Sequence, residues 1–194
     1  MATDIFSVDT HRSLDSELVT EDIKEGEPVV RLEGGGLRLL DPANDDDVHF
    51  LVVHQRDGDH NPRYDNRYQS YEDLFTYQPA ANKDGGESSD TFDDRAPILP
   101  LVNNDVVRSY LIEDESQPEP SIEENVEVGY VDLGNGPRLV EAGYTDGGGT
   151  QYGDGGAGDY VPIGVVDRLP HHTNHLGDYG ELIPVRVDTL PTVN

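Results

Sequence analysis

The chain has 194 residues, no cysteine and a formal net charge of −27, from 40 Asp and Glu side chains against 13 Lys and Arg side chains. This length predicts one domain or little more. The charge argues against nucleic acid as a partner because phosphates would be repelled, and a chain without cysteine has neither disulfides nor thiolate metal sites. No apolar run reaches membrane-spanning length and no signal-peptide pattern is visible, so we expect no membrane partner and synthesis inside a cell.

The high acidity has two interpretations. A chain of low hydrophobicity and high net charge can be disordered, or it can be a folded protein adapted to molar salt. Ten tyrosines and several strand patterns favour folding, and Lys24 and Lys83 are the only lysines. At about 1 M salt the Debye length is roughly 3 Å, so repulsion among carboxylates is largely screened. The composition therefore predicts a halophilic protein whose fold weakens in dilute salt.

The predicted fold class is mostly β: a small β-barrel or β-sandwich with long acidic loops and one short helix as a further candidate. Residues 1–20 are expected to be an N-terminal arm, because Ile5 and Phe6 are apolar but no period is sustained around them. Such an arm either becomes ordered against a neighbouring molecule or frays. Residues 21–194 are expected to be the β-domain, with an elaborated insertion at about residues 55–125.

The first strand patterns of this domain lie in residues 26–40. They form a strand, a turn at three consecutive glycines and a second strand, because glycine supplies the positive φ that a tight connection needs. A phosphate-binding loop is the alternative, but the Lys-Ser/Thr and the helix of that motif do not follow. Residues 48–54 predict a buried central strand.

A short amphipathic helix is the candidate for the region after residue 60. Asn61 would cap it and Pro62 would occupy its first position. Its aromatic side chains then share one face, which we expect to pack on the sheet or on a neighbouring subunit rather than to bind a sugar or base. These predicted interface residues are Tyr64, Tyr68, Tyr71 and Phe75, together with Ile5 and Phe6 of the arm.

The remaining strand patterns follow in the second half of the chain. Residues 145–159 are expected to be a Gly- and Asp-rich loop. The last two strands form a closing hairpin and each contains a proline, which predicts edge strands or a bulge, and Gly164 predicts a bulge or a close backbone approach. The strands are expected at residues 98–102, 106–112, 126–133, 137–142, 160–169 and 182–187.

Two clusters of side chains are candidates for metal ligands. Asp57, Asp59 and Asp65 lie in a segment that begins like a calcium loop, although the glycine and the final glutamate of that motif are missing. The segment is therefore not a complete calcium motif and no cofactor is certain, and a structural Ca²⁺ or Mg²⁺ is the alternative that its carboxylates leave open. The second cluster would bind zinc or nickel with a carboxylate such as Asp178, and its alternative is a polar loop with incidental histidines. Its members are His171, His172 and His175.

Catalytic motifs do not emerge from the sequence. There is no Gly-x-Ser-x-Gly elbow, no His-Glu-x-x-His pattern and no Walker motif. Pairs of carboxylates are uninformative in a chain with 40 acidic side chains. We therefore expect a protein that is not an enzyme and has no catalytic residue.

Three short segments carry a resemblance to a known family. Residues 26–34 contain Gly26, Pro28, Val29 and Gly34, and the two last strands read Val-Pro-Ile-Gly-Val-Val and Ile-Pro-Val-Arg-Val. This pattern resembles the decoration (cement) proteins of tailed-virus capsids, and residues 55–125 take no part in it.

The resemblance implies a small β-barrel that forms homotrimers on the capsid lattice and clamps neighbouring major capsid proteins. With the halophilic composition, it implies a virion protein at the capsid surface of a virus infecting halophilic archaea, assembled in the host cytoplasm. No catalytic residue is implied, because the family has none. The alternatives from the residues themselves are a receptor- or glycan-binding surface module and a halophilic intracellular enzyme.

Overall fold

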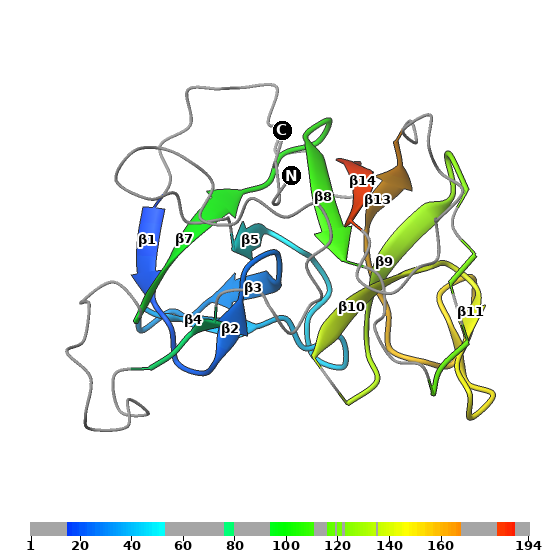
Figure 1. Ribbon diagram of the computed structural model, residues 1–194, viewed down its shortest axis with the longest axis horizontal. Coiled ribbons are helices and arrows are strands. Elements are labelled where there is room, and N and C mark those ends of the chain that lie inside the picture. Colours follow the sequence, from blue (N-terminus) through cyan, green and yellow to red (C-terminus); the bar gives the residue numbers. More distant parts are fainter. Residues whose placement is uncertain are drawn as a thin grey trace.

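The computed structural model describes residues 15–52, 76–79, 94–110, 116–118, 120–121, 123–134, 136–167 and 182–188. These residues form fourteen strands and no helix. Most of the strands belong to two five-stranded antiparallel sheets, which lie beside each other in Figure 1. The predicted fold class, a mostly β protein built as a small β-barrel or β-sandwich, is therefore confirmed.

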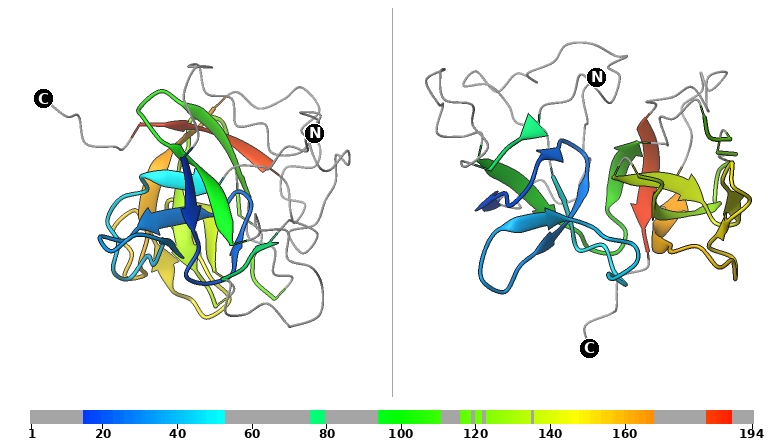
Figure 2. Two further views of the ribbon diagram at one scale, coloured as in Figure 1. Left: turned by 90° about the vertical axis from the view of Figure 1, so that its left-hand side faces the viewer. Right: turned by 90° about the horizontal axis from the view of Figure 1, so that it is seen from below.

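The first sheet has the strand order β1-β7-β5-β3-β4, and every neighbouring pair is antiparallel. Beyond β1, Val19 forms a parallel bridge with Leu37 of β4, and the Thr20 amide donates to the Leu37 carbonyl oxygen at 2.9 Å. The two ends of the strand order are thus joined, and the sheet curls into a partial barrel (Figure 2). Its strands are β1 (Asp15–Leu18), β7 (Arg95–Pro100), β5 (Phe50–Val52), β3 (Pro28–Arg31) and β4 (Leu37–Leu39).

The second sheet has the order β10-β9-β13-β14-β8 and is also antiparallel throughout. Its strands are β10 (Pro137–Glu141), β9 (Glu127–Asp132), β13 (Val161–Val166), β14 (Leu182–Val187) and β8 (Val106–Tyr110). Two short antiparallel pairs complete the fold: β2 (Ile23–Lys24) with β6 (Thr76–Tyr77), and β11 (Tyr144–Thr145) with β12 (Gln151–Tyr152).

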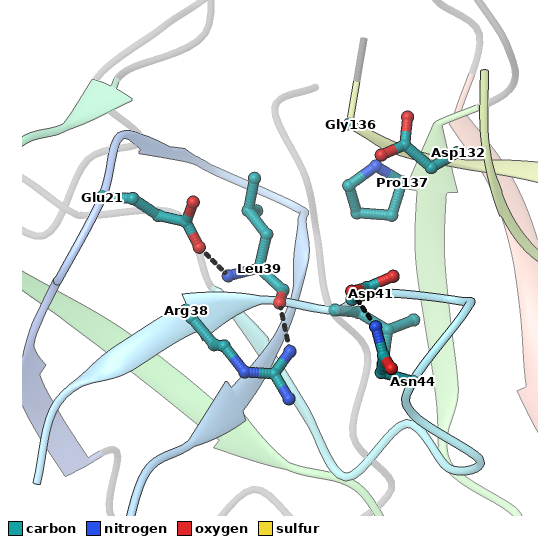
Figure 3. A pocket seen from close by; sticks show the side chains of 9 residues that line it. Glu21, Arg38, Leu39, Asp41, Asn44, Asp132, Gly136 and Pro137 are labelled. Carbon is teal, nitrogen blue, oxygen red and sulfur yellow. Dashed lines mark hydrogen bonds between the residues drawn. The ribbon is translucent and has the colours of Figure 1, made fainter. Parts of the chain in front are cut away.

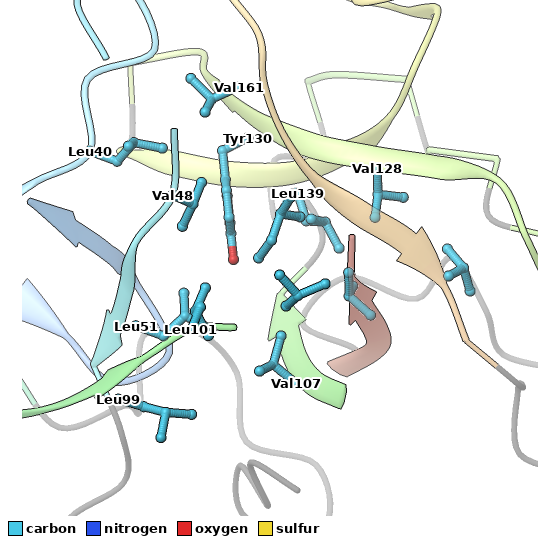
Figure 4. Packing of buried hydrophobic residues seen from close by; sticks show 14 residues of the cluster. Leu40, Val48, Leu51, Leu99, Leu101, Val107, Val128, Tyr130, Leu139 and Val161 are labelled. Atoms are coloured by element: carbon cyan, nitrogen blue, oxygen red, sulfur yellow. The ribbon is translucent and has the colours of Figure 1, made fainter. Parts of the chain in front are cut away.

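The main hydrophobic core lies between the two sheets. Leu51 and Leu99 come from the first sheet, and Tyr130 and Leu139 come from the second, with Val48 in the segment before β5. Figure 4 shows these side chains gathered in one layer, with Tyr130 pointing into it. Because burial of apolar surface is the main driving force of folding, this shared layer makes the two sheets one packed unit.

Each sheet is also covered on its other face. A second cluster, with Val29, Ile98 and Tyr77 among its members, fills the inside of the curled first sheet beneath β2 and β6. A third cluster places Val131 and Val140 against Tyr144 of the β11–β12 pair. Cover on two faces explains why burial is continuous along the middle of β9 and along most of β10 instead of alternating from residue to residue.

The closing hairpin is the most accurate of the sequence predictions. β14 has the predicted bounds, and it pairs antiparallel with β13. The register shifts between Pro162 and Gly164, and a Cβ at Gly164 would overlap the Arg186 carbonyl oxygen, so the predicted bulge and close approach are both confirmed. The expectation of edge strands is wrong, because β13 and β14 are both internal to the sheet.

The glycine turn is confirmed as well. β3 and β4 pair across it, and Gly35 and Gly36 have φ values of 89° and 95°, a region that favours glycine. The strand predicted at residues 48–54 is represented by β5, which is central in the first sheet as expected.

Other elements differ from the sequence interpretation or go beyond it. Residues 145–159 are not only a loop, because they contribute to β11 and β12. β1 comes from the end of the range predicted as an arm. β7, β8, β9 and β10 confirm the strands predicted at residues 98–102, 106–112, 126–133 and 137–142, although β7 begins three residues earlier than expected. The predicted helix and residues 1–14 lie outside the described residues, so the arm and the insertion stay predictions.

Candidate functional site

The metal-ligand and interface residues predicted from the sequence all lie outside the described part of the chain. This holds for the predicted metal ligands Asp57, Asp59, Asp65, His171, His172 and His175, and for the predicted interface residues Ile5, Phe6, Tyr64, Tyr68, Tyr71 and Phe75. Among the residues that the structure does describe, no three His, Asp or Glu side chains are grouped to hold a metal ion. The metal and interface predictions therefore remain untested.

The candidate site is a polar pocket of about 430 Å³ at the seam between the two sheets. One wall comes from the first sheet, through β4, the loop after it and Glu21. The opposite wall comes from the end of β9 and the start of β10, as Figure 3 shows. The pocket is lined by Glu21, Arg38, Leu39, Leu40, Asp41, Asn44, Asp132, Gly136 and Pro137.

Arg38 is the cationic side chain of this pocket, and its charge is largely neutralised by Asp45. The two form a bidentate pair, with Nη1 to Oδ2 at 2.7 Å and Nη2 to Oδ1 at 2.6 Å. This hydrogen bonding lowers the pKa of Asp45 and raises the pKa of Arg38, although partial burial opposes both shifts. Because the guanidinium is already engaged, the pocket offers little positive charge to an anion.

Carboxylates dominate the rest of the lining. The Glu21 carboxylate accepts a hydrogen bond from the Leu39 amide at 2.7 Å. Asp41 accepts from the Asn44 side-chain amide at 2.6 Å, and Asp132 accepts from the Gly134 amide at 2.7 Å. Asp41 and Asp132 hold tight turns, the role for which aspartate is favoured in loops. The pocket therefore presents negative charge, which disfavours nucleotides and other anions as ligands.

A buried ion pair lies behind the pocket wall. A Cβ on Gly136 would stand 3.6 Å from both Arg138 Nη1 and Glu27 Oε1. Those two atoms are 3.1 Å apart, and the side chains of Glu27 and Arg138 are almost fully buried. Gly136, which lines the pocket, therefore separates it from an ion pair between charged residues of the two sheet regions.

A second ordered feature is the turn between β11 and β12. The Asp146 carboxylate accepts hydrogen bonds from the Thr150 amide at 2.8 Å, from the Gly148 amide at 2.9 Å and from the Tyr152 hydroxyl at 3.1 Å. These bonds, that of Thr150 first, lower the pKa of Asp146. The bonds of Asp146 explain why a segment rich in glycine, which reads as a loop, becomes a fixed hairpin.

Sequence reasoning missed both the pocket and the ion pair. An aspartate whose carboxylate accepts from the amide two residues later is typical of turns, and Asp41 and Asp132 both do so. These turns beside the pocket are local features that the sequence could have indicated. The Glu27–Arg138 contact joins residues 111 positions apart, so no local pattern could have indicated it.

Comparisons with protein-family models, with curated proteins and with solved structures find no match to this chain. Among the described residues, no helix is long and apolar enough to cross a membrane.

Proposed function

We propose that this chain is a structural virion protein that decorates and stabilises the capsid surface of a tailed virus infecting halophilic archaea. The observation that most supports the proposal is the position of the three segments that resemble decoration proteins. Two of them, in β13 and β14, are paired internal strands of the second sheet, and the third forms β3 and its glycine turn in the first sheet. The segments that resemble decoration proteins therefore form strands inside both main sheets.

The composition supports an outer position on a particle in brine. A net charge of −27 on each chain would make neighbouring virions repel one another and stay soluble. Molar salt screens the repulsion among carboxylates within one subunit. The pocket at the seam has the same character, since its carboxylates outnumber its one arginine.

The proposed partners are further copies of the chain, as a homotrimer, and the major capsid protein. Among the described strands, β1 pairs along its length with β7 alone, and the closure toward β4 begins only past its end, at Val19. Residues 1–14, which include Ile5 and Phe6, directly precede β1 in the chain. Strands at sheet edges are sites where another chain can add hydrogen bonds. Leu18 at the end of β1 is an exposed large apolar side chain, with 47% of its surface accessible. A neighbouring subunit that covers this edge would bury it.

Quantitative mass spectrometry of purified virions from the source of the chain tests the proposal. A decoration protein is expected in the particles at a copy number comparable to that of the major capsid protein, and it should be lost when the particles are dialysed to low salt. Absence from purified virions would contradict the proposal. Specific binding of the purified chain to a glycan panel, together with a copy number of only a few per particle, would favour a receptor-binding module instead.

A further inference from the structure

A buried ion pair joins the two sheets within the part of the chain that the structure describes. Glu27 lies directly before β3, and its backbone carbonyl accepts a hydrogen bond from the Val52 amide of β5 at 3.0 Å, which fixes it to the first sheet. Arg138 belongs to β10 of the second sheet and pairs in register with Val131 of β9. Arg138 Nη1 lies 3.1 Å from Glu27 Oε1, with side-chain exposures of 6% and 5%.

Both partners are also held by backbone groups. The Lys24 amide donates to Glu27 Oε2 at 2.7 Å, and Arg138 Nη1 donates to the Pro137 carbonyl oxygen at 2.7 Å. The carboxylate of Glu27 and the guanidinium of Arg138 are therefore each oriented by a backbone group of their own sheet region as well as by each other. A directed contact of this kind fixes relative position more sharply than an apolar layer, because hydrophobic burial is not directional.

Three ion-pair groups on the surface of the described region have a different character. Arg31 pairs with Asp15 and Glu17 inside the first sheet, Arg38 pairs with Asp45 in the loop after β4, and Arg186 pairs with Asp167 inside the second sheet. Their arginine side chains are 31–41% exposed. They are open to screening by salt and, being local, cannot set the position of one sheet against the other.

We propose that the Glu27–Arg138 pair is a lock that holds the two sheets in one relative position, and that it keeps working at salt concentrations that screen the surface pairs. Ions of the solvent cannot enter between two buried groups in contact, so molar salt leaves their attraction in place. Loss of one charge removes an opposite charge that lies in contact with a buried group, and breaking a buried ion pair is far costlier than losing an exposed one.

Distance measurements between two spin labels test the lock directly. The chain has no cysteine, so labels can be attached uniquely at Glu33→Cys, in the turn after β3, and at Thr145→Cys, in β11. Both positions are exposed. The variant is Glu27→Gln, and the matched control is Asp45→Asn, which removes the charge that pairs with the partly exposed Arg38.

At about 3 M KCl, where the Debye length is below about 3 Å, the parent and Asp45→Asn are expected to give one narrow distance distribution. Glu27→Gln is expected to give a broadened distribution or a second distance. Its melting temperature should fall by roughly 10 °C, and the fall should persist between about 1 M and 4 M KCl, whereas Asp45→Asn should lose no more than about 3 °C.

A narrow, parent-like distribution in Glu27→Gln would overturn the lock, and so would a loss of stability that disappears as salt rises. If Glu27→Gln does not fold, the double variant Glu27→Leu/Arg138→Met removes both charges together and keeps the site apolar. That variant is expected to fold and to show the broadened distribution. A single narrow distance in it would equally contradict the proposal.

Discussion

Replacing Gly164 with alanine is the sharpest perturbation that the fold offers. Gly164 lies in β13, between β9 and β14, at the point where the register with β9 shifts. An added Cβ would overlap the Arg186 carbonyl oxygen and would lie 2.9 Å from the Arg186 carbonyl carbon and 3.0 Å from the Val187 Cα. The obstacle is therefore the backbone of the neighbouring strand and not a flexible side chain.

The size of the effect follows from that geometry. Carbon atoms in ordinary contact are about 3.5–4.0 Å apart, so the Arg186 carbonyl carbon and the Val187 Cα alone would require β14 to move by roughly 0.5–1 Å. The overlapping Arg186 carbonyl oxygen requires a larger movement than that. Val185 and Val187 of β14 are fully buried in the core between the sheets, so the shift would also disturb that packing. Overpacking of a tight core costs about 1–3 kcal/mol, and for a chain of this length about 3 kcal/mol lowers the melting temperature by roughly 6–12 °C.

Thermal unfolding followed by circular dichroism at about 3 M KCl, where surface repulsion is screened, measures the change. Gly34→Ala is the matched control, because nothing lies within 4 Å of a Cβ at Gly34 and its φ is not positive. The control is expected to melt within about 2 °C of the parent. A Gly164→Ala variant that melts as the control does would refute the account of the β13–β14 contact.

Two further predictions concern titration. The pKa of Tyr160 is raised, by burial first and then by the charges of Glu127 and Glu141, and its hydroxyl has no hydrogen-bond partner among the described residues. In the unfolded chain the Tyr160 hydroxyl loses its proton near the ordinary pKa of 10.0, whereas in the folded protein it keeps the proton to higher pH. Deprotonation therefore favours the unfolded chain, and the free energy of unfolding falls as pH rises beyond 10. Tyr160→Phe should be at least as stable at pH 7 and should lose less stability in melting curves between about pH 9 and 11; a steeper loss would contradict this. The pKa of Asp45 is lowered from 3.8, so its contribution is present above pH 3.8 and disappears as pH falls through the lowered value. Asp45→Asn should melt below the parent at pH 7 by an amount worth at most about 1 kcal/mol, because the pair is partly exposed, and the two curves should converge in acid; a difference independent of pH would exclude this role.

Sequence reasoning succeeded where the signal was local. The run of alternating apolar residues in β14 and the glycines before β4 are governed by strand period and backbone conformation, which neighbouring residues determine. Gly164 was recognisable for the same reason, since glycine inside a strand pattern usually marks a bulge or a close approach.

The sequence predictions were wrong or missing where an element depends on residues that are distant in the sequence. The prolines of β13 and β14 suggested edge strands, but Pro162 lies at the bulge, and the sheet continues on both sides of β13 and β14. β1 has a weak pattern of its own and exists because β7 offers a pairing edge.

The seam pocket depends even more on distant parts of the chain. It needs β4 and the β9–β10 turn, which are about a hundred residues apart, to meet through the shared core. The candidate ligands at residues 57–65 and 171–175 were chosen for local density of ligating side chains, and they lie outside the described residues.

Light scattering coupled to size exclusion, at about 2–3 M salt and again after dialysis to low salt with a chelator, tests the central claim most directly. A halophilic decoration protein is predicted to run as a stable homotrimer in high salt and to dissociate or unfold in low salt. A monomer that is indifferent to salt would contradict both the adaptation to brine and the proposed place on a capsid.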